Sequence, residues 1–522
     1  MSEEKSRIAR AAGVVGGATL MSRILGFVRD AFIANLFGAG MAADAFFVAF
    51  RIPNMFRRLL GEGSLTSSFI PVFTEYLTQK PREEAREMAN SFFSLALVVL
   101  SLVTIVGIIF APQIVTVLAH GFTSIPEKFT MTVTLTRMMF PYLFFIGLVA
   151  LCMGILNSLR HFAAPALSPV LLNISMILSV VLLAPFFKEP VMALAIGVLI
   201  GGVSQLALQL PFLWKNGMHI KLQWKPRHPG VVRVGWLMAP SIIGLAVTQI
   251  NVLVDTIVAS FLKEGTVSYL YYADRLLEFP MGIFAIAIAT AVLPAMSEKA
   301  AKNDMTGVKD TFSYALRLTL FLTIPAMVGL MALGIPIISI LFQRGLFSYN
   351  STVETSRALY GFAIGLPAFA GVRIIVPVFY SMQDTKTPVK VAFVAMLTNV
   401  TCDLLFMYPL EQFGLSLATS LSACVNFAIL AYILRKRIGR VGARRILVSA
   451  SKVMAASIFM GIVAYSICMT KDWSVAGEIH GKVLTLISGI FAGVFIFTLS
   501  SYLLKSEELL SVISLVRNRY KK

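Results

Sequence analysis

Charged side chains are scarce in this chain of 522 residues. Asp, Glu, Lys and Arg make up 14% of it, whereas 57% of its residues are hydrophobic and the mean hydropathy is +0.81. A soluble domain carries about 25% charged residues, so the composition excludes an ordinary soluble protein. Apolar runs long enough to cross a bilayer as helices recur along the chain, without the alternation typical of a barrel. We therefore predict an all-α, polytopic membrane protein.

Cysteine and histidine are also few. The four cysteines fall inside apolar runs and form no CxxC pair, and the five histidines are scattered at span ends and in loops. A disulfide framework and a thiolate metal site are thus not expected. The chain also lacks a Walker loop, an HExxH motif and a nucleophile elbow. These absences predict a protein that is not an enzyme and requires no cofactor. Without an ATP site, any work that it performs would be driven by an ion gradient or the membrane potential.

Acidic residues are outnumbered, 26 against 45 basic ones, for a net charge of +19. Such an excess can mark nucleic-acid binding, but here most of it lies in short loops between apolar spans, where it orients a membrane protein. Nucleic acid is therefore not a predicted partner, and both termini are predicted to be cytoplasmic. The loops predicted to lie outside contain few basic residues: Lys128, Lys188, Lys263, Arg344, Lys471 and Lys482.

The apolar pattern predicts fourteen transmembrane helices. They are expected at 10–37, 42–62, 88–117, 130–157, 163–187, 190–214, 230–262, 266–296, 310–343, 354–382, 387–409, 412–436, 446–469 and 482–504. Landmarks repeat after a shift of about 220 residues, for example Arg51 with Arg275 and Pro71 with Pro294. A shift by six helices preserves direction, so the repeat is parallel. We predict an N-terminal lobe at 1–220, a C-terminal lobe at 221–440, and an extra helix pair with a cytoplasmic tail at 441–522.

Several charged residues fall inside the predicted spans. An ionisable residue at the bilayer centre costs roughly 2.5–3.5 kcal/mol on insertion scales, so such residues usually face a cavity and have a function. The alternative is that the arginines extend to the headgroups. The arginines are Arg23, Arg29, Arg51, Arg57, Arg58 and Arg275, and their predicted acidic partners are Asp44, Glu62 and Glu278.

The spacing of these residues predicts how they group. Arg51 and Arg58 are seven apart and share a helix face. Arg275 and Glu278 are three apart and can pair, and Pro280 is expected to disturb the helix after them. Arginine is always charged and its planar fork bonds two oxygens at once. We predict a cationic cavity between the lobes that binds a phosphate or pyrophosphate.

A second group contains oxygen ligands only: Asp255, Asn399, Asp403 and Thr419. Asn399 and Asp403 are four apart on one predicted helix. Hard oxygen ligands suit a small hard cation, so Na⁺ or proton coupling is one interpretation. An interhelical hydrogen-bond cluster is the other.

Four segments carry a resemblance to a known family: SRILGFVRD, FGAGMAADAFFVAFRIPNMFRRLLGEG, YYADRLLEFPMG and MQDTKTPVK. They are similar to the signature segments of the MurJ (MviN) lipid II flippases, in the multidrug/oligosaccharidyl-lipid/polysaccharide exporter superfamily. The resemblance covers essentially the whole chain. It implies fourteen spans in two lobes with an added C-terminal pair. It also implies functional roles for Arg23, Arg29, Asp44, Arg57 and Arg275.

The resemblance further implies the cargo. Lipid II, the undecaprenyl-pyrophosphate disaccharide pentapeptide, would move from the inner to the outer leaflet of the bacterial inner membrane by alternating access, for peptidoglycan synthesis. The last two spans would line a hydrophobic groove for the polyprenyl tail. Expected partners are lipid II, membrane lipids and proteins of wall synthesis and division. Two alternatives stay open: a flippase for another polyprenyl-linked glycan of the O-antigen type, and a membrane scaffold that transports nothing.

Overall fold

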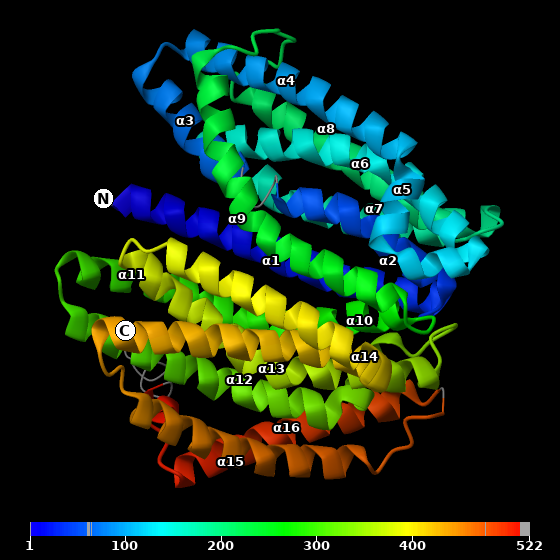
Figure 1. Cartoon of the computed structure of the whole chain (residues 1–522), viewed down its shortest axis with the longest axis vertical. Helices are drawn as coiled ribbons and strands as arrows, with labels where there is room; N and C mark the ends of the chain where they lie inside the picture. Colours follow the sequence, from blue (N-terminus) through cyan, green and yellow to red (C-terminus); the bar gives the residue numbers. More distant parts are fainter. Residues whose placement is uncertain (1, 60–62, 64, 476, 512–522) are drawn as a thin grey trace. The chain divides into compact units, whose positions relative to one another are not determined.

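The computed structural model describes residues 2–59, 63, 65–475 and 477–511, with side chains except at 2–12 and 243–248. Every regular element in these ranges is helical (Figure 1), which confirms the predicted all-α fold. The chain forms two compact units, Met1–Val267 and Ser268–Lys522. Glu62, one of the predicted acidic partners, lies outside the described residues.

The first unit is built around one buried helix. Its elements are α1 (Ser2–Phe37), α2 (Met41–Arg57), α3 (Leu65–Gln79), α4 (Arg82–Ile109), α5 (Ala111–Leu118), η2 (His120–Ser124), α6 (Pro126–Ser158), α7 (Ala163–Leu183), η3 (Ala184–Phe186), α8 (Met192–Lys215) and α9 (Pro229–Ser260). The helix α6 contacts α2, α3, α4, α5 and α8. In its most apolar stretch 78% of the residues are buried, against 28% in α4. The exposed apolar side chains of α4, such as Leu102 and Ile109, are therefore expected to face lipid.

The second unit follows from α10, which begins at the end of the first. Its elements are α10 (Thr266–Pro280), η4 (Met281–Ala285), α11 (Ile286–Ala301), α12 (Met305–Phe342), α13 (Tyr349–Ser381), α14 (Lys386–Ile438), α15 (Ala443–Cys468) and α16 (Ile479–Leu503). The helix α13 packs between α12 and α14, while α15 and α16 pack on each other and on α12. Small residues allow these close approaches, since a Cβ on Gly461 would lie 2.7 Å from Val328.

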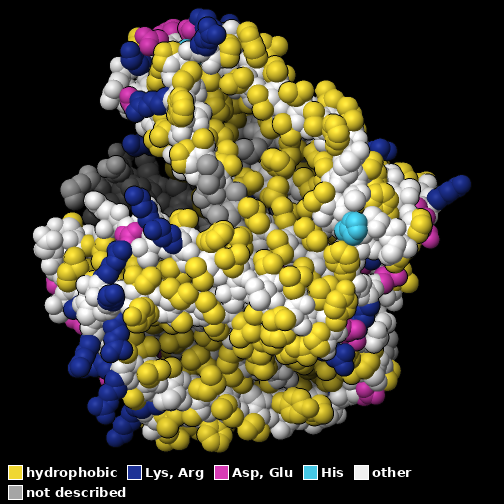
Figure 2. All heavy atoms as spheres, in the orientation of Figure 1, with side chains coloured by type: hydrophobic (Ala, Val, Ile, Leu, Met, Phe, Trp, Pro, Cys, Tyr) yellow, Lys and Arg dark blue, Asp and Glu magenta, His cyan; other side chains and the backbone are white. Residues whose placement is uncertain are grey.

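The helix α16 is the least buried of the candidate spans among the described residues. Only 11% of its apolar stretch is buried, and Phe491 and Phe495 are exposed. In Figure 2 apolar side chains cover most of the visible surface, and Lys and Arg gather along its margin. This distribution is what a lipid-facing surface with charged ends requires.

Each predicted span overlaps a helix of the structure. Within the described residues ten helices are long and apolar enough to cross a membrane, so a polytopic protein is confirmed and the count of fourteen stays a prediction. The spans predicted at 387–409 and 412–436 join in α14, where Glu411 breaks the helical backbone with φ +50°. The disturbance expected at Pro280 is present as η4, a π-helical turn directly after it.

The segment between α8 and α9 lies along α4 as an extended strap, residues 216–225. The side chains of Arg82 and Arg86 donate to the carbonyl oxygens of Asn216 (2.9 Å) and Gly217 (2.8 Å). Further along α4, Asn90 Oδ1 accepts the backbone N–H of residue 221 at 3.1 Å, and Ser94 Oγ accepts that of residue 223 at 2.8 Å. The four α4 residues are spaced four apart and so share one face of the helix. The backbone of the strap is therefore held by hydrogen bonds with side chains from a single face of α4.

The start of α9 is also fixed to the first unit. Arg233 pairs with Glu75 of α3 at 2.9 Å, and a Cβ on Gly230 would lie 2.8 Å from Met88. The first compact unit consequently runs beyond the strap and includes α9, up to Val267. The predicted lobe boundaries at 220 and 440 rest on the sequence repeat, and they stay a prediction.

Candidate functional site

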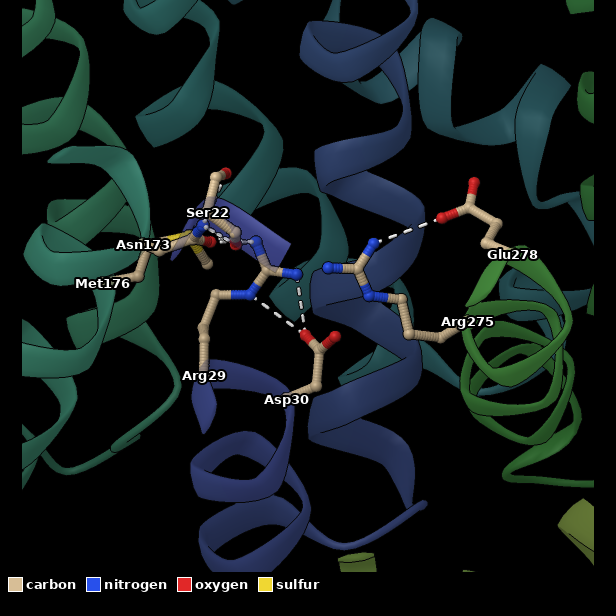
Figure 3. A network of polar contacts seen from close by, with 7 residues as sticks. All are labelled: Ser22, Arg29, Asp30, Asn173, Met176, Arg275 and Glu278. Atoms are coloured by element: carbon tan, nitrogen blue, oxygen red, sulfur yellow. Dashed lines mark hydrogen bonds and ion pairs between the residues drawn. The ribbon is translucent and has the colours of Figure 1, made fainter. Parts of the chain in front are cut away.

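Arg29 and Asp30 form a buried ion pair within α1. The guanidinium donates from Nε and Nη2 to Asp30 Oδ1, at 3.0 and 2.7 Å, and Asp30 is 0% exposed. Its Nη1 donates to Asn173 Oδ1 of α7 at 3.1 Å (Figure 3). Asn173 in turn donates from Nδ2 to the carbonyl oxygen of Ser22 at 3.0 Å. One acidic and one neutral side chain therefore hold the guanidinium inside the first unit.

The other arginines predicted for this unit are half-buried. Arg23 lies on α1, Arg51 and Arg57 lie on α2, and Arg58 directly follows α2. Arg57 donates from Nε to Asn54 Oδ1 at 3.1 Å, one turn earlier on the same helix. Because α1 and α2 contact each other, these guanidinium groups come from two adjacent helices and from the residue directly after α2. Their binding of an anion stays a prediction.

Asp44, at the start of α2, pairs with a lysine. Lys128 Nζ lies 2.7 Å from Asp44 Oδ2, with both side chains almost fully buried. The same oxygen accepts the backbone N–H of Gly265 at 2.8 Å, and Nζ lies 4.0 Å above the ring of Phe122. The sequence predicted Asp44 as a partner of the arginines. That partnership stays a prediction, and the structure adds an ion pair with Lys128, because the first turn of α6 lies beside the start of α2.

Arg275 and Glu278 belong to the second unit, on α10. Arg275 Nη1 donates to Glu278 Oε2 at 3.2 Å (Figure 3), the pair that their spacing predicts. Their side chains are 23% and 46% exposed. The π-helical turn η4 begins three residues after Glu278. A shared cavity that Arg275 forms with the arginines of the first unit stays a prediction.

The predicted cation ligands divide between the units. Asn399 Nδ2 donates to Asp403 Oδ2 at 2.8 Å on α14, and both residues are 0% exposed. Thr419 lies further along α14 and donates to its own helix at Leu415 O. Asp255 lies on α9 of the first unit. Among the described residues no group of three or more His, Cys, Asp or Glu side chains could hold a metal ion. The structure therefore brings together Asn399 and Asp403, and the cation site stays a prediction.

Two partners of the predicted site residues were not expected from the sequence. Asn173 is a lone amide in the apolar run LLNISM, which gives no signal of an arginine partner. Lys128 was placed among the outer-loop lysines, yet it is 2% exposed at the third position of α6. A lysine just inside the start of an apolar helix, together with an unmatched aspartate elsewhere, is the signal that could have indicated a buried pair.

Known proteins resemble the chain across nearly its full length. A "Probable lipid II flippase MurJ" of Vibrio cholerae serotype O1 is 39% identical over 496 residues, which cover 94% of both chains. A "Lipid II flippase MurJ" of Burkholderia cenocepacia is 38% identical over 432 residues, covering 82% of this chain and 84% of the relative.

Solved structures give the same result at the level of the fold. The structure titled "Lipid II flippase MurJ, inward closed conformation" matches with a TM-score of 0.77 and 28% identity, over 94% of this chain and 98% of the other. An inward-facing multidrug resistance MATE family transporter of the MOP superfamily matches with a TM-score of 0.66. At 14% identity over 82% of this chain and 98% of the transporter, this second match shows the fold alone.

The family model described as "Lipid II flippase MurJ" matches residues 33–502. That range runs from the end of α1 to the end of α16 and includes both units. Because this model matches most of the chain, and relatives of the same family are 38–39% identical, the chain belongs to the lipid II flippase MurJ family.

Proposed function

We propose that this protein is a lipid II flippase, which moves the undecaprenyl-pyrophosphate-linked precursor of peptidoglycan from the cytoplasmic to the periplasmic leaflet of the bacterial inner membrane. The observation that carries the proposal is Arg29. It is 9% exposed on a helix of a MurJ family member and is oriented by Asp30 and Asn173. A buried guanidinium in a membrane segment is costly, and its retention with dedicated partners indicates a function.

The arginines would bind the pyrophosphate of the headgroup. Arg23, Arg29, Arg51, Arg57 and Arg58 of the first unit, with Arg275 of the second, supply planar donors that stay charged at any physiological pH. A diphosphate offers several acceptor oxygens, so more than one guanidinium can bind it with paired hydrogen bonds. The acidic partners Asp30 and Glu278 would balance this charge when no headgroup is bound.

Transport would proceed by alternating access, with no covalent bond made or broken. The headgroup would enter from the cytoplasm while the polyprenyl tail stays in a hydrophobic groove lined by α15 and α16. The low burial of α16 and its exposed Phe491 and Phe495 support a tail-binding role for this pair. Every second loop contains few basic residues and is therefore predicted to lie outside. This pattern supports cytoplasmic termini. Proteins of wall synthesis and division are proposed partners by virtue of the cargo.

Coupling to Na⁺ or protons is part of the proposal. The buried Asn399 and Asp403 offer amide and carboxylate oxygens, which are hard ligands suited to Na⁺, and a carboxylate can instead take a proton. Asp255 and Thr419 would complete such a site. Na⁺ would supply a charge whose binding favours one of two conformations.

Binding of three lipids to the purified protein tests the cargo. We expect lipid II to bind more tightly than undecaprenyl monophosphate, and more tightly than an undecaprenyl-pyrophosphate-linked O-antigen sugar. Arg29→Ala should weaken lipid II binding about tenfold or more, because a hydrogen bond to a charged group contributes about 1.5–3 kcal/mol. Arg435→Ala, at the exposed end of α14, is the matched control and should bind as the wild type does. Equal affinity for all three lipids, or preference for the O-antigen lipid, would overturn the proposal.

A further inference from the structure

Asn173 of α7 joins two points of α1 that lie two turns apart. Its Oδ1 accepts from Arg29 Nη1 at 3.1 Å, and its Nδ2 donates to Ser22 O at 3.0 Å (Figure 3). Side chains on a helix point towards its N-terminus, so the guanidinium of Arg29 extends back along α1 in the direction of Ser22. A short amide on the neighbouring helix can therefore reach both groups at once.

The polarity of both neighbours fixes the orientation of this amide. A guanidinium only donates hydrogen bonds and a backbone carbonyl only accepts them. Exchanging Oδ1 and Nδ2 would bring two donors together at Arg29 and two acceptors together at Ser22. Asn173 is 6% exposed, and Met176, one turn along α7, is 1% exposed with its sulfur 4.0 Å from Nη1. The amide is thus locked in one arrangement by burial and by hydrogen bonding.

The neutral charge of Asn173 is as informative as its geometry. Asp30 already takes Nε and Nη2 of Arg29 and offsets its charge. A second carboxylate at position 173 would also accept from Nη1, but it would add a negative charge beside Arg29. It would place an oxygen against Ser22 O as well. An amide orients the guanidinium without reducing its attraction for an anion.

We propose that Asn173 is a positioning residue, which holds the guanidinium of Arg29 in the direction required to bind the pyrophosphate of the cargo. This inference rests on the proposed function, since it concerns the same anion. Asn173 acts through Arg29 and does not itself need to touch the ligand. Its loss therefore weakens headgroup binding only while Arg29 is present.

A double-mutant cycle on lipid II binding tests the inference, using the purified full chain as wild type, Asn173→Leu, Arg29→Ala and the double variant. We expect Asn173→Leu to weaken binding about tenfold, and to add less than about twofold in the Arg29→Ala background, as for residues that act as a unit. Independent losses that multiply in the double variant would overturn it. Undetectable binding by the wild type would instead contradict the proposed function.

A second variant separates positioning from packing. Asn173→Asp keeps the size of the side chain and the acceptor for Nη1, so we expect the variant to fold, with a melting temperature lowered by several degrees because an oxygen replaces the donor to Ser22 O. Lipid II affinity should nevertheless fall about tenfold, because the added charge repels the pyrophosphate. Unchanged or tighter lipid II binding by Asn173→Asp would overturn the inference. This test can be made even if Asn173→Leu does not fold. Leu178→Ala, an exposed position on α7, is the control and should leave both values unchanged.

Discussion

Buried charges of the first unit are held by specific partners within that unit. Arg29 is held by Asp30 and Asn173, and Asp44 is held by Lys128 and the backbone N–H of Gly265. Apolar residues of similar size would often stabilise a fold as well as a buried ion pair does. The presence of these buried charges therefore supports the proposed binding role of Arg29 more than it accounts for stability.

One charged residue outside the spans has a structural role that pH can reveal. Asp384 precedes α14, accepting from the Thr387 hydroxyl at 2.5 Å and its N–H at 2.9 Å, and pairing with Arg437 at 2.5 Å. The hydroxyl of Thr387 is the main cause that lowers the pKa of Asp384 from 3.8 to about 2, with its N–H and Arg437 adding to the effect. A carboxyl whose pKa falls on folding stabilises the fold above its unfolded pKa. That stabilisation is lost as the pH drops from about 4 to about 2.

We expect Asp384→Asn to destabilise the protein at pH 7 by about 1 kcal/mol, because the amide keeps an acceptor for the Thr387 N–H but loses the ion pair with Arg437 and the charge-assisted hydrogen bonds. The melting temperatures of wild type and variant should converge as the pH is lowered below about 4. Thermal unfolding in detergent between pH 7 and pH 3 measures this. Asp310→Asn, at an exposed position of α12, should change little. A difference between wild type and Asp384→Asn that stays constant with pH would contradict the assignment.

Among the connecting elements, the strap at 216–225 depends on hydrogen bonds from one face of α4. Of the two hydrogen bonds that α4 makes with the turn at Gly217, the one donated by Arg86 is the shorter, at 2.8 Å. Gly217 has φ +76°, a backbone conformation that glycine adopts most readily. Substitution of Arg86 should therefore loosen the strap without disturbing the apolar packing of α4.

We expect Arg86→Ala to speed trypsin cleavage after Lys221, an exposed strap residue. The lost charge-assisted hydrogen bond is worth about 2 kcal/mol, so local opening should become about 30-fold more frequent. Cleavage of the purified protein over time, followed by mass spectrometry, measures the effect. Glu83→Ala, exposed on the same helix, is the control. Equal cleavage rates in Arg86→Ala and wild type would show that this contact does not hold the strap.

Hydrophobic periodicity was sufficient to predict the helices but not their connections. Every predicted span overlaps a helix, and Pro280 marked the π-helical turn η4. The amphipathic helix α3 was not predicted, because its fifteen residues contain no run long enough to span a bilayer. The strap was not predicted either, since it is held mainly through backbone groups, which no residue pattern displays.

The sequence also indicates only part of the candidate site, namely its charged residues and not their partners. Arginines in apolar runs stand out against hydrophobic neighbours, so six candidates could be named without knowledge of the fold, and their shared site stays a prediction. Their uncharged and long-range partners do not stand out. Asn173 is 144 residues from Arg29, and Lys128 is 84 residues from Asp44. Such pairings follow from tertiary packing, which a single sequence does not specify by spacing.

At the scale of the whole molecule, α9 is fixed to the first unit at both ends. The strap and Arg233 hold its start. After its end, Glu264 accepts the backbone N–H of Met41 at 2.7 Å and Gly265 donates to Asp44. The chain therefore passes to the second unit only after Gly265. We expect α9 to move with the first unit during transport, although the sequence repeat assigns it to the second lobe.

The most direct test of the account is lipid II translocation in bacteria depleted of their own flippase. Wild type and Arg275→Ala would be compared at matched membrane abundance, with Arg435→Ala as the control for a basic residue outside the predicted site. We predict that the wild type and the control translocate lipid II and that Arg275→Ala loses most of this activity. Equal translocation by all three would contradict an anion-binding role for Arg275, and failure of the wild type would contradict lipid II as the cargo.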